Sequence, residues 1–520
     1  MISRHTLTIA GFAGAAFVVG IFFKIAWVTD DAYITFRSIE QLFAGNGPRW
    51  NPHERVQVFT SPLWFGYLSV FRIFSENVFV NAIAASALVF VPTLIIIRTI
   101  LKDNLRWLLV MAVLVSSIGF FDYTTSGLEN PLAYLLIATW LLFFFRLFDE
   151  SESSARKTRA LQILLIAAGL LIVVRHDLLT LILPPTLWAG WTHRREFSRG
   201  HCAILLAAAL APLVVWSVFS LLYYGSIFPN TAFAKLMSGI SRLRMLGQGA
   251  GYLWIGLKYD TVTTLVPLLA CVVLLLSKRY ERRALGAGIV LNLAYIVYIG
   301  GDFMLGRFLS YAFLVGLIAL VRWYGPAQRM DLAIALVASV LYMFFYPHTP
   351  VNSPVPYRNT PPHPMGISDE RGSYVRGSLH RYLTVDGPIF PDHQWAVDGF
   401  AFSMSKEVMQ ERLATGYFGY WAGTEKIILD RFGLSDPLLA RLPADQREVW
   451  RIGHFGRRLP SGYIETITSG ENTIEDPVIH DYYEKLRLIT QGEPLLASER
   501  IITIILMNLG AYNYTIRDYR

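Results

Sequence analysis

The chain has 520 residues, of which 54% are hydrophobic and only 16% are charged. A soluble domain usually carries about 25% charged residues, so this composition excludes one large soluble core. The net charge of +8 does not indicate nucleic-acid binding. Lys and Arg stand in short clusters between apolar blocks rather than on one face.

The apolar blocks are about 15 to 21 residues long, close to the length that crosses a hydrocarbon core of about 30 Å. We read the first block as an uncleaved helix, because no small-residue cleavage site precedes Asp30. The segment 62–74 is too short for a crossing and predicts a re-entrant or interfacial helix. The sequence therefore predicts an α-helical polytopic membrane protein with about eleven transmembrane helices, at 7–27, 78–98, 106–122, 131–148, 160–176, 177–191, 203–223, 260–277, 284–300, 303–323 and 331–346.

Basic residues indicate the orientation of these helices. With a cytoplasmic N-terminus, the inner loops hold the clusters at 98–106, 156–159, 194–199, 278–283 and 322–329, whereas the loops at 122–130 and 300–302 have no Lys or Arg. This is the positive-inside bias. Counting 62–74 as a crossing would invert every later loop. We therefore expect a multi-pass protein of the cytoplasmic membrane whose conspicuous polar segments face outward.

Composition then divides the chain into three parts. Residues 1–346 form the predicted transmembrane module, and seven prolines within 347–364 predict an extended linker at 347–366. The remaining residues, 367–520, predict an extracytoplasmic α+β domain, since an odd number of crossings precedes them. Within it, the apolar run Ile501–Met507 predicts a buried strand.

The adjacent carboxylates Asp30 and Asp31 follow the first apolar block. Two such groups at a membrane surface repel each other unless a cation or substrate shares them, or one has a raised pKa. A general base for a sugar hydroxyl needs such a carboxylate in a partly dry site. The alternative is a helix N-cap. The residues alone leave both roles open, and two acids could also hold a divalent ion.

Three further outward segments carry ionisable residues. Arg175, His176 and Asp177 lie between two apolar blocks, and Asp302 and Arg307 flank a glycine-rich turn. Such residues near a membrane are functional candidates, although local salt bridges would explain both segments equally well. Glu129 lies in a third turn, and a structural role is favoured for it.

Cations would be needed if the substrate carries a phosphate, because Arg suits bidentate phosphate contact. Aromatic faces could stack on a sugar, and the segment around Trp450 and His454 mixes basic and aromatic residues. A solvated basic loop is the competing interpretation there, and a membrane anchor is the competing one for Trp64. The outward cations are Arg37, Arg55, Arg175, His176, Lys235 and Arg307.

Several motifs are absent from the sequence: a phosphate-binding Gly-rich loop with Lys-Ser/Thr, metal-type Cys/His spacing and a nucleophile elbow. Their absence disfavours a soluble nucleotide-sugar enzyme and an ATP-driven pump. A transporter of lipid-linked sugars should carry polar residues near the middle of its helices, whereas the predicted helix centres here are almost purely apolar.

A set of short motifs, taken in order, resembles the actinobacterial terminal arabinofuranosyltransferases of cell-wall arabinan and their pilin-arabinosylating relatives, which belong to the GT-C class of membrane glycosyltransferases. The family often has Arg-Pro-Asp where this chain has Arg175-His176-Asp177, so His176 is a local departure. The motifs stand at 30–37, 45–47, 60–64, 126–129, 175–177, 229–231 with Lys235, 300–307 and 433–437.

The resemblance implies a GT-C-like bundle and transfer of an arabinofuranosyl unit from a polyprenyl-phosphate carrier, of decaprenyl or undecaprenyl type, to a glycan or glycoprotein hydroxyl outside the membrane. A related enzyme using another polyprenyl-linked sugar is the alternative. Asp30 and Asp31 become the reaction carboxylates, with Asp30 favoured as the base. The implied donor-phosphate ligands are Arg37, Arg175, His176, Lys235 and Arg307, and the implied sugar or acceptor ligands are Glu129, Asp177, Asp302, Trp64, Trp450 and His454. These residues are expected to converge at the outer membrane boundary.

Overall fold

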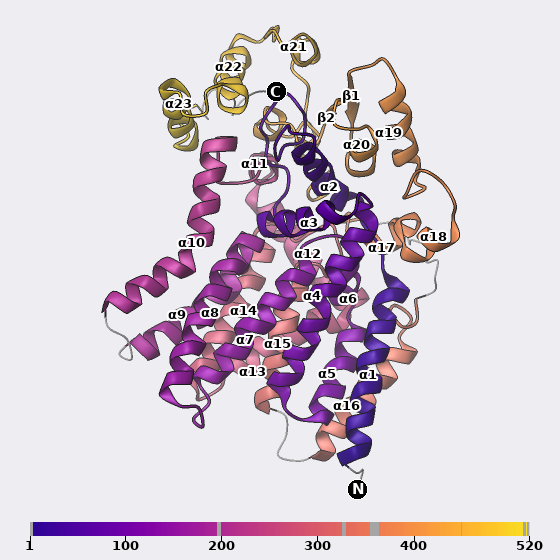
Figure 1. Ribbon diagram of the computed structural model, residues 1–520, viewed down its shortest axis with the longest axis vertical. Coiled ribbons are helices and arrows are strands. Elements are labelled where there is room, and N and C mark those ends of the chain that lie inside the picture. The colour runs from indigo at the N-terminus through magenta and orange to yellow at the C-terminus, as the bar shows by residue number, and fades with distance from the viewer. Residues whose placement is uncertain are drawn as a thin grey trace. The chain divides into compact units, whose positions relative to one another are not determined.

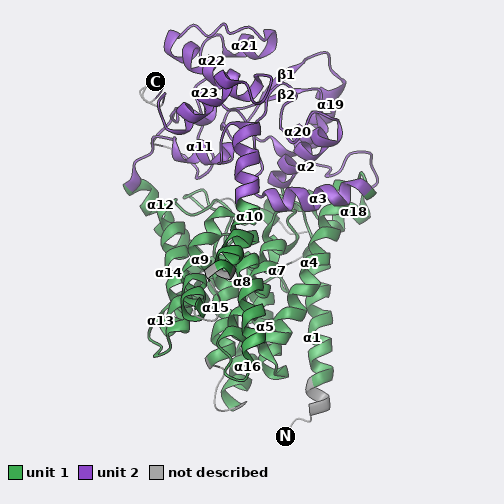
Figure 2. Cartoon of the chain, turned by 60° about the vertical axis from the view of Figure 1, so that its left-hand side comes forward, with its two compact units in different colours: residues 1–29, 74–213, 243–385 green, residues 30–73, 214–242, 386–520 purple. Residues whose placement is uncertain are grey.

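The computed structural model describes residues 4–194, 199–324, 329–353, 363–448, 450–512, 516 and 519. Helices dominate the described chain, with one two-stranded sheet (Figure 1). The chain divides into two compact units, drawn in different colours in Figure 2. Unit 1 comprises Met1–Thr29, Phe74–Leu213 and Leu243–Val385, and unit 2 comprises Asp30–Ile73, Val214–Arg242 and Asp386–Arg520.

Unit 1 is a helical bundle built from the apolar blocks of the sequence. Polar residues begin several of its helices: the side chain of Asn77 accepts from the N–H of Val80, and that of Asp103 accepts from Leu105 and Arg106. Its longer helices are α1 (Arg4–Ile25), α4 (Val78–Leu101), α5 (Asn104–Ser116), α6 (Ile118–Thr125), α7 (Asn130–Leu147), α8 (Ser154–Val174), α9 (Leu179–His193), the first half of α10 (Arg199–Tyr224), α12 (Arg242–Tyr259), α13 (Thr261–Leu275), α14 (Tyr280–Tyr298), α15 (Leu309–Tyr324) and α16 (Arg329–Phe345).

Helix α15 lies at the centre of unit 1, where it contacts α4, α5, α6, α7, α13 and α14. Short elements follow the bundle helices or connect them: η1 (His176–Leu178), α17 (Glu370–Ser373), η3 (Val375–Gly377) and α18 (Leu379–Thr384). Ten of the eleven predicted crossings each overlap a single α-helix, whereas 106–122 runs across the break between α5 and α6, and α12 was not predicted.

Fewer helices meet the length and apolarity of a membrane crossing than the sequence predicts. Among the described residues, five helices are long and apolar enough to cross a membrane, or seven if two bent pairs each count as one crossing. Helices α15 and α16 are apolar but shorter. The protein is membrane-embedded, and eleven crossings stay a prediction.

Both bent pairs meet at one residue, Asp260. Helices α5 and α6 are bent by 77°, and α12 and α13 by 116°. Asp260, between α12 and α13, accepts hydrogen bonds from the backbone N–H groups of Ile118 (3.2 Å) and Gly119 (2.7 Å) at the start of α6. One carboxylate thus satisfies the amides that the break in α5–α6 exposes.

Unit 2 gathers three separate stretches of the chain around a core that includes Leu438, Tyr463, Leu486 and Ile504. Strand β1 (Met409–Arg412) pairs in parallel with β2 (Ile427–Asp430), Met409 opposite Ile427. The helices of unit 2 are α2 (Asp30–Phe43), α3 (Pro62–Phe74), the second half of α10, α11 (Asn230–Leu236), α19 (Gln394–Met404), α20 (Gly416–Trp421), η4 (Leu439–Arg441), α21 (Tyr463–Ser469), α22 (Pro477–Gln491) and α23 (Ser498–Asn508).

The strand predicted at Ile501–Met507 is wrong, because these residues belong to helix α23. Buried positions in this helix recur at Arg500, Thr503, Ile504 and Met507, which is helical spacing. An unbroken apolar run hides that periodicity. With only β1 and β2 as paired strands among the described residues, the predicted α+β character of the C-terminal part is not confirmed.

The compact units also have bounds that differ from the predicted domains. Residues 30–73 and 214–242 join unit 2, although both stretches precede the predicted C-terminal domain and the second begins inside the predicted crossing 203–223, and residues 363–385 belong to unit 1. Part of the predicted linker, 354–362, lies outside the described residues. Unit 2 therefore combines the C-terminal stretch with two shorter stretches from the first half of the chain.

Candidate functional site

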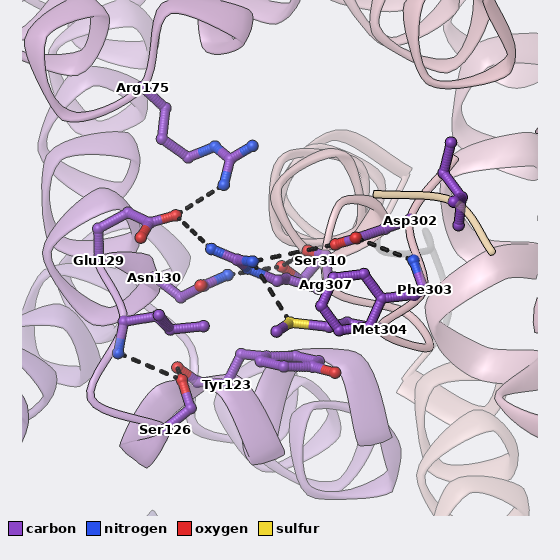
Figure 3. Close-up of polar contacts among 12 residues, drawn as sticks. Tyr123, Ser126, Glu129, Asn130, Arg175, Asp302, Phe303, Met304, Arg307 and Ser310 are labelled. Carbon is purple, nitrogen blue, oxygen red and sulfur yellow. Dashed lines mark hydrogen bonds and ion pairs between the residues drawn. The ribbon is translucent and has the colours of Figure 1, made fainter. Parts of the chain in front are cut away.

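Unit 1 brings together the predicted site residues Arg175, Asp177 and Glu129. The Arg175 guanidinium donates from Nε and Nη2 to the two carboxylate oxygens of Asp177, both at 2.9 Å, and from Nη1 to Glu129 Oε1 at 2.6 Å. Arg175 and Glu129 are buried. The local Arg–Asp pair anticipated from sequence therefore exists, and Figure 3 shows the contact of Arg175 with Glu129.

Arg307 completes this network from the glycine-rich turn before α15. Its Nη2 donates to the same Glu129 oxygen at 3.0 Å, and its Nη1 lies 4.0 Å from Asp302 Oδ2. Figure 3 shows Glu129 between the two guanidinium groups. Burial alone would raise the pKa of Glu129, but the charges of Arg307 and Arg175 lower it to about 2. Glu129 is therefore an ionised bridge between two arginines.

Two glycines allow the turn that carries Asp302 and Arg307. Gly301 has a φ of +72°, and a Cβ there would lie 2.6 Å from the side chain of Tyr252. Gly306 has a φ of +75°, and a Cβ there would lie 2.8 Å from Gly119 Cα. Only glycine fits this backbone and these close approaches. These two glycines therefore allow the backbone path that positions Arg307.

Several buried polar atoms of this cluster have no hydrogen-bond partner within the part of the chain that the structure describes. They are Arg307 Nε, the Tyr311 hydroxyl and Asn130 Oδ1. Tyr311 also lies against Arg175, whose guanidinium carbon is 5.5 Å from the centre of its ring. Unpaired buried polar atoms cost free energy, so the cluster has capacity for water or a polar ligand.

His176 lies in η1 beside Arg175 and is half-buried. The hydrogen bonds found among the described residues include none from its ring. Its ring adds no hydrogen bond to the arginine–carboxylate network among the described residues, and its predicted donor-phosphate role stays a prediction.

Unit 2 holds the two adjacent carboxylates. Asp30 opens α2 and accepts hydrogen bonds from the backbone N–H groups of Gly416 (3.1 Å) and Tyr417 (2.6 Å) at the start of α20. It therefore caps α20 rather than α2. Gly416 is required there, because a Cβ would lie 2.8 Å from the Asp30 carboxyl carbon.

The two carboxylates have different surroundings. Asp30 is only 5% exposed, whereas Asp31 is half-buried. Burial raises the pKa of Asp30 to about 7, the two backbone hydrogen bonds oppose that shift, and the charge of Asp31 adds to it. Asp30 consequently titrates near neutral pH, which suits a general base.

Arg37 does not resemble a phosphate ligand in this structure. It is 1% exposed, and all its donors reach backbone carbonyls: Trp50 at 3.0 Å, Gly423 and Lys426 at 2.6 Å, and Gly419. These contacts join α2 to the segment that follows α20. Spacing could not reveal this role, because a buried arginine and a ligand-binding arginine look alike in sequence.

Arg37→Ala is expected to lower the free energy of unfolding of unit 2 by about 3 kcal/mol, because several buried carbonyls lose their donor. Denaturant unfolding followed by tryptophan fluorescence measures this change. The control is Arg431→Ala. Arg431 forms a partly exposed ion pair with Glu411, and loss of this pair should lower the free energy of unfolding by at most about 1 kcal/mol. Equal stability of the two variants, with weaker donor binding in Arg37→Ala, would restore the phosphate-binding prediction.

The remaining predicted ligands are spread over unit 2. Lys235 is exposed in the last turn of α11, and Trp64 is buried in α3 with its ring 5.5 Å from that of Tyr67. The Trp450 ring lies 5.6 Å from that of Phe455 and is tilted against it by 51°, and the His454 ring lies beside Phe432. Burial lowers the pKa of His454 to about 4. Trp64 and His454 thus occupy structural positions.

Two of the recognised motifs meet for a structural reason. The amide of Asn230 donates to the backbone carbonyls of Gly433, Leu434 and Asp436 at 2.9 to 3.1 Å. Asp436 in turn accepts from the Leu439 N–H at 2.7 Å and from a tyrosine hydroxyl at 2.8 Å. The asparagine therefore ties α11 to the 433–437 turn.

Asp436 and Glu54 form a buried acidic pair in unit 2. Burial raises the pKa of both carboxyl groups, and the charge of Glu54 raises that of Asp436 further. The pKa of each carboxyl group is higher in the folded state than in the unfolded state. The protonated groups therefore stabilise the fold fully below the unfolded pKa of about 4, and this stabilisation is lost as the pH rises through the folded-state pKa values. The melting temperature should therefore fall between pH 5 and pH 8.

Glu54→Gln is expected to reduce that fall, because one of the two ionising groups is removed. Thermal melts at pH 5 and pH 8 test this, with Glu411→Gln, a partly exposed carboxylate, as the control that keeps the wild-type pH dependence. An unchanged pH dependence in Glu54→Gln would assign the effect to other groups.

No group of three or more His, Cys, Asp or Glu side chains among the described residues is placed to hold a metal ion. The divalent cation considered from the sequence therefore gains no ligand set in this part of the chain.

Comparisons with known proteins show what this chain is similar to. A terminal beta-(1->2)-arabinofuranosyltransferase of Corynebacterium glutamicum is 27% identical over 351 residues, which are 57% of this chain and 48% of that protein. One of the same name from Mycobacterium tuberculosis is 28% identical over 230 residues, or 41% of this chain and 35% of that protein. The chain is similar to terminal arabinofuranosyltransferases. The predicted resemblance is thereby confirmed.

The similarity to these relatives covers only part of their length. The chain spans about half the length, or less, of the curated relatives it matches, and no protein-family model matches it. The crystal structure of ArnT from Cupriavidus metallidurans in the apo state aligns with a TM-score of 0.50 at 12% identity, covering 82% of this chain and 87% of that one. This likeness concerns the fold and supports the predicted GT-C-like architecture.

Sequence reasoning missed two parts of the structure. Tyr33, one turn after Asp30, has a buried hydroxyl without a partner among the described residues. In unit 1, Arg371 forms an ion pair with Asp122 at 3.0 Å. The helical spacing that places Tyr33 on the same face as Asp30 was the one sequence signal available for this tyrosine. Asp122 and Arg371 are too far apart in the chain for any sequence pattern to predict their ion pair.

Proposed function

We propose that this chain is a membrane glycosyltransferase that moves an arabinofuranosyl unit from a polyprenyl-phosphate donor to an acceptor hydroxyl on the outer side of the cytoplasmic membrane. The observation that carries the proposal is Asp30. It is a nearly buried carboxylate, oriented by two backbone amides, with a pKa raised to about 7. Similarity to arabinofuranosyltransferases supports arabinofuranose as the transferred sugar.

The acceptor side of the reaction is assigned to Asp30. Its ionised carboxylate removes the proton of the acceptor hydroxyl as the hydroxyl oxygen bonds to the anomeric carbon of the donor. The bond between that carbon and the phosphate oxygen breaks, and the phosphate leaves with the electron pair. Asp31 acts through charge, because it raises the pKa of Asp30.

The donor side is assigned to the arginine cluster of unit 1. A departing phosphate gains negative charge, which a buried guanidinium stabilises. Arg307 is the better candidate of the two arginines, because its Nε has no partner within the described part of the chain. Arg175 already has three contacts to carboxylate oxygens and orients Glu129 instead.

The residue before Asp30 has a contact within unit 1. Thr29, the residue before Asp30, belongs to unit 1, where its backbone N–H donates to the Ser126 carbonyl at 3.0 Å. Ser126 opens the turn that ends at Glu129. The roles of Glu129, Asp177 and Asp302 change accordingly, from sugar ligands to groups that hold arginines.

The proposal is tested with the full chain in lipid nanodiscs. Synthetic decaprenyl-phosphoarabinofuranose and an arabinofuranosyl oligosaccharide are supplied, and mass spectrometry follows the mass added to the oligosaccharide by one pentose residue. The expected result is one added pentose with release of decaprenyl phosphate. Polyprenyl-linked mannose and aminoarabinose serve as competing donors.

The outcomes separate the candidate functions. Transfer of only a competing sugar would favour the related polyprenyl-dependent transferase. Donor movement across the membrane of proteoliposomes without transfer would favour a transporter and contradict the proposal. The predicted orientation is tested separately by labelling cysteines placed at exposed positions from either side of sealed vesicles.

A further inference from the structure

The side chain of Tyr33 lies fully inside unit 2, yet its hydroxyl is not satisfied. The residue is 1% exposed, and the hydroxyl has no hydrogen-bond partner among the described residues. Buried tyrosine hydroxyls usually find a partner. An unfilled one indicates that a water or a ligand atom completes it.

Tyr33 stands directly beside the carboxylate assigned to the reaction. Positions i and i+3 of a helix share a face, so Tyr33 lies on the face of α2 that carries Asp30. Its ring contacts two rings of α20, that of Tyr417 at 4.7 Å and that of Tyr420 at 5.3 Å between centroids, both edge to face. A carboxylate, a hydroxyl and aromatic faces are therefore neighbours.

Further aromatic side chains extend this group beyond Tyr417. The His393 ring lies 5.5 Å from Tyr417 and 4.6 Å from Trp395, and Trp421 lies 5.7 Å from Tyr420. His393, Trp395, Tyr420 and Trp421 are each half-buried, so part of each ring is accessible. This combination suits a sugar, whose C–H faces pack on rings while its hydroxyls need hydrogen-bonding groups.

The aromatic group is held rigidly against α2. Asp30 binds the backbone N–H groups of Gly416 and Tyr417 at one end of α20, and Arg37 binds the carbonyls of Gly419 and Gly423 at the other. Both ends of α20 are thus fixed to a single helix. A binding site gains precision when its residues stand on fixed elements.

We propose that Tyr33 and α20 form the acceptor-sugar subsite, in which the Tyr33 hydroxyl hydrogen-bonds a hydroxyl of the acceptor glycan next to the one that reacts at Asp30. This inference rests on the proposed function and adds the place and chemistry of acceptor recognition. A furanose residue of a glycan is the acceptor class that the subsite fits. A polyprenyl chain is a poor occupant, because it would leave the Tyr33 hydroxyl unpaired.

Tyr33→Phe tests the subsite, because it removes only the hydroxyl. With the arabinofuranosyl oligosaccharide as acceptor, KM for the acceptor should rise about five- to tenfold, the effect of one lost hydrogen bond, while KM for decaprenyl-phosphoarabinofuranose stays unchanged. Calorimetric binding of the oligosaccharide without donor should weaken by the same factor. Tyr420→Ala should weaken it further.

Tyr482→Phe is the matched control. Tyr482 belongs to the same unit, is 2% exposed and also has a hydroxyl without a partner among the described residues, but it packs in α22. Its variant should bind and transfer like the wild type. If Tyr33→Phe behaves as Tyr482→Phe does, only water fills the position and the subsite is refuted. If the wild type transfers no sugar at all, the proposed function fails instead.

Discussion

Asp30→Asn should reduce sugar transfer by about 10²- to 10⁴-fold, the usual contribution of a general base. The amide cannot take a proton from the acceptor, although it keeps the size of the carboxyl group. It also offers one acceptor oxygen where Asp30 accepts from both Gly416 and Tyr417. Initial rates in nanodiscs measure the loss, and circular dichroism with thermal melting shows whether the variant is folded.

Asp31→Asn separates the two carboxylates. Its charge is one of the causes that raise the pKa of Asp30, so its removal should lower that pKa. Transfer by the wild type should rise with pH through about 7, where Asp30 ionises, and this limb should move to lower pH in Asp31→Asn. A folded Asp30→Asn that keeps wild-type transfer, beside an inactive Asp31→Asn, would reverse the assignment.

Glu129→Ala should have the largest effect on the stability of unit 1. The variant leaves Arg175 and Arg307 buried without the carboxylate that both contact at 2.6 and 3.0 Å. Breaking a buried pair on one side costs about 3 to 5 kcal/mol. Thermal aggregation of the detergent-solubilised protein, followed by light scattering, should begin at a clearly lower temperature.

Glu150→Ala provides the control for this effect. Glu150 pairs with Arg279 at 3.0 Å on the surface, where its side chain is 87% exposed, and such pairs contribute at most about 1 kcal/mol. Similar thermal stability of the Glu129 and Glu150 variants would show that Glu129 does not bridge the arginines. It would also return Glu129 to the sugar ligands predicted from sequence.

The helices of the bundle could be predicted because long apolar blocks separated by charged clusters leave few alternatives. Helix α3 was predicted for the same reason. The helical structure of α23 could not be predicted, since an unbroken apolar run fits a strand and a helix equally well. The breaks at Asp260 were also invisible, because they depend on contacts with Gly119 and Ile118, far away in the chain.

Several residues of the candidate site could be predicted from the sequence, but the roles of some of these residues could not. Arg175 and Asp177 are neighbours in sequence, so their pair was expected, but the bridge through Glu129 required the fold. The carbonyl partners of Arg37 at 419–426 leave no trace in the local sequence, so these contacts could not be predicted, and its donor-phosphate role stays a prediction. The convergence of Asp30 with Asp177 and Arg307 stays a prediction, since Asp30 belongs to unit 2 and the others to unit 1.

Chemical rescue tests most directly the central claim that a carboxylate at position 30 removes the acceptor proton. Asp30→Ala leaves space that formate can enter, and acetate, which is larger, is the control ion. The account predicts that added formate restores part of the lost transfer in Asp30→Ala and does not stimulate the wild type. A folded Asp30→Ala protein that binds both substrates but gains nothing from formate, or that transfers sugar at the wild-type rate, would contradict the claim.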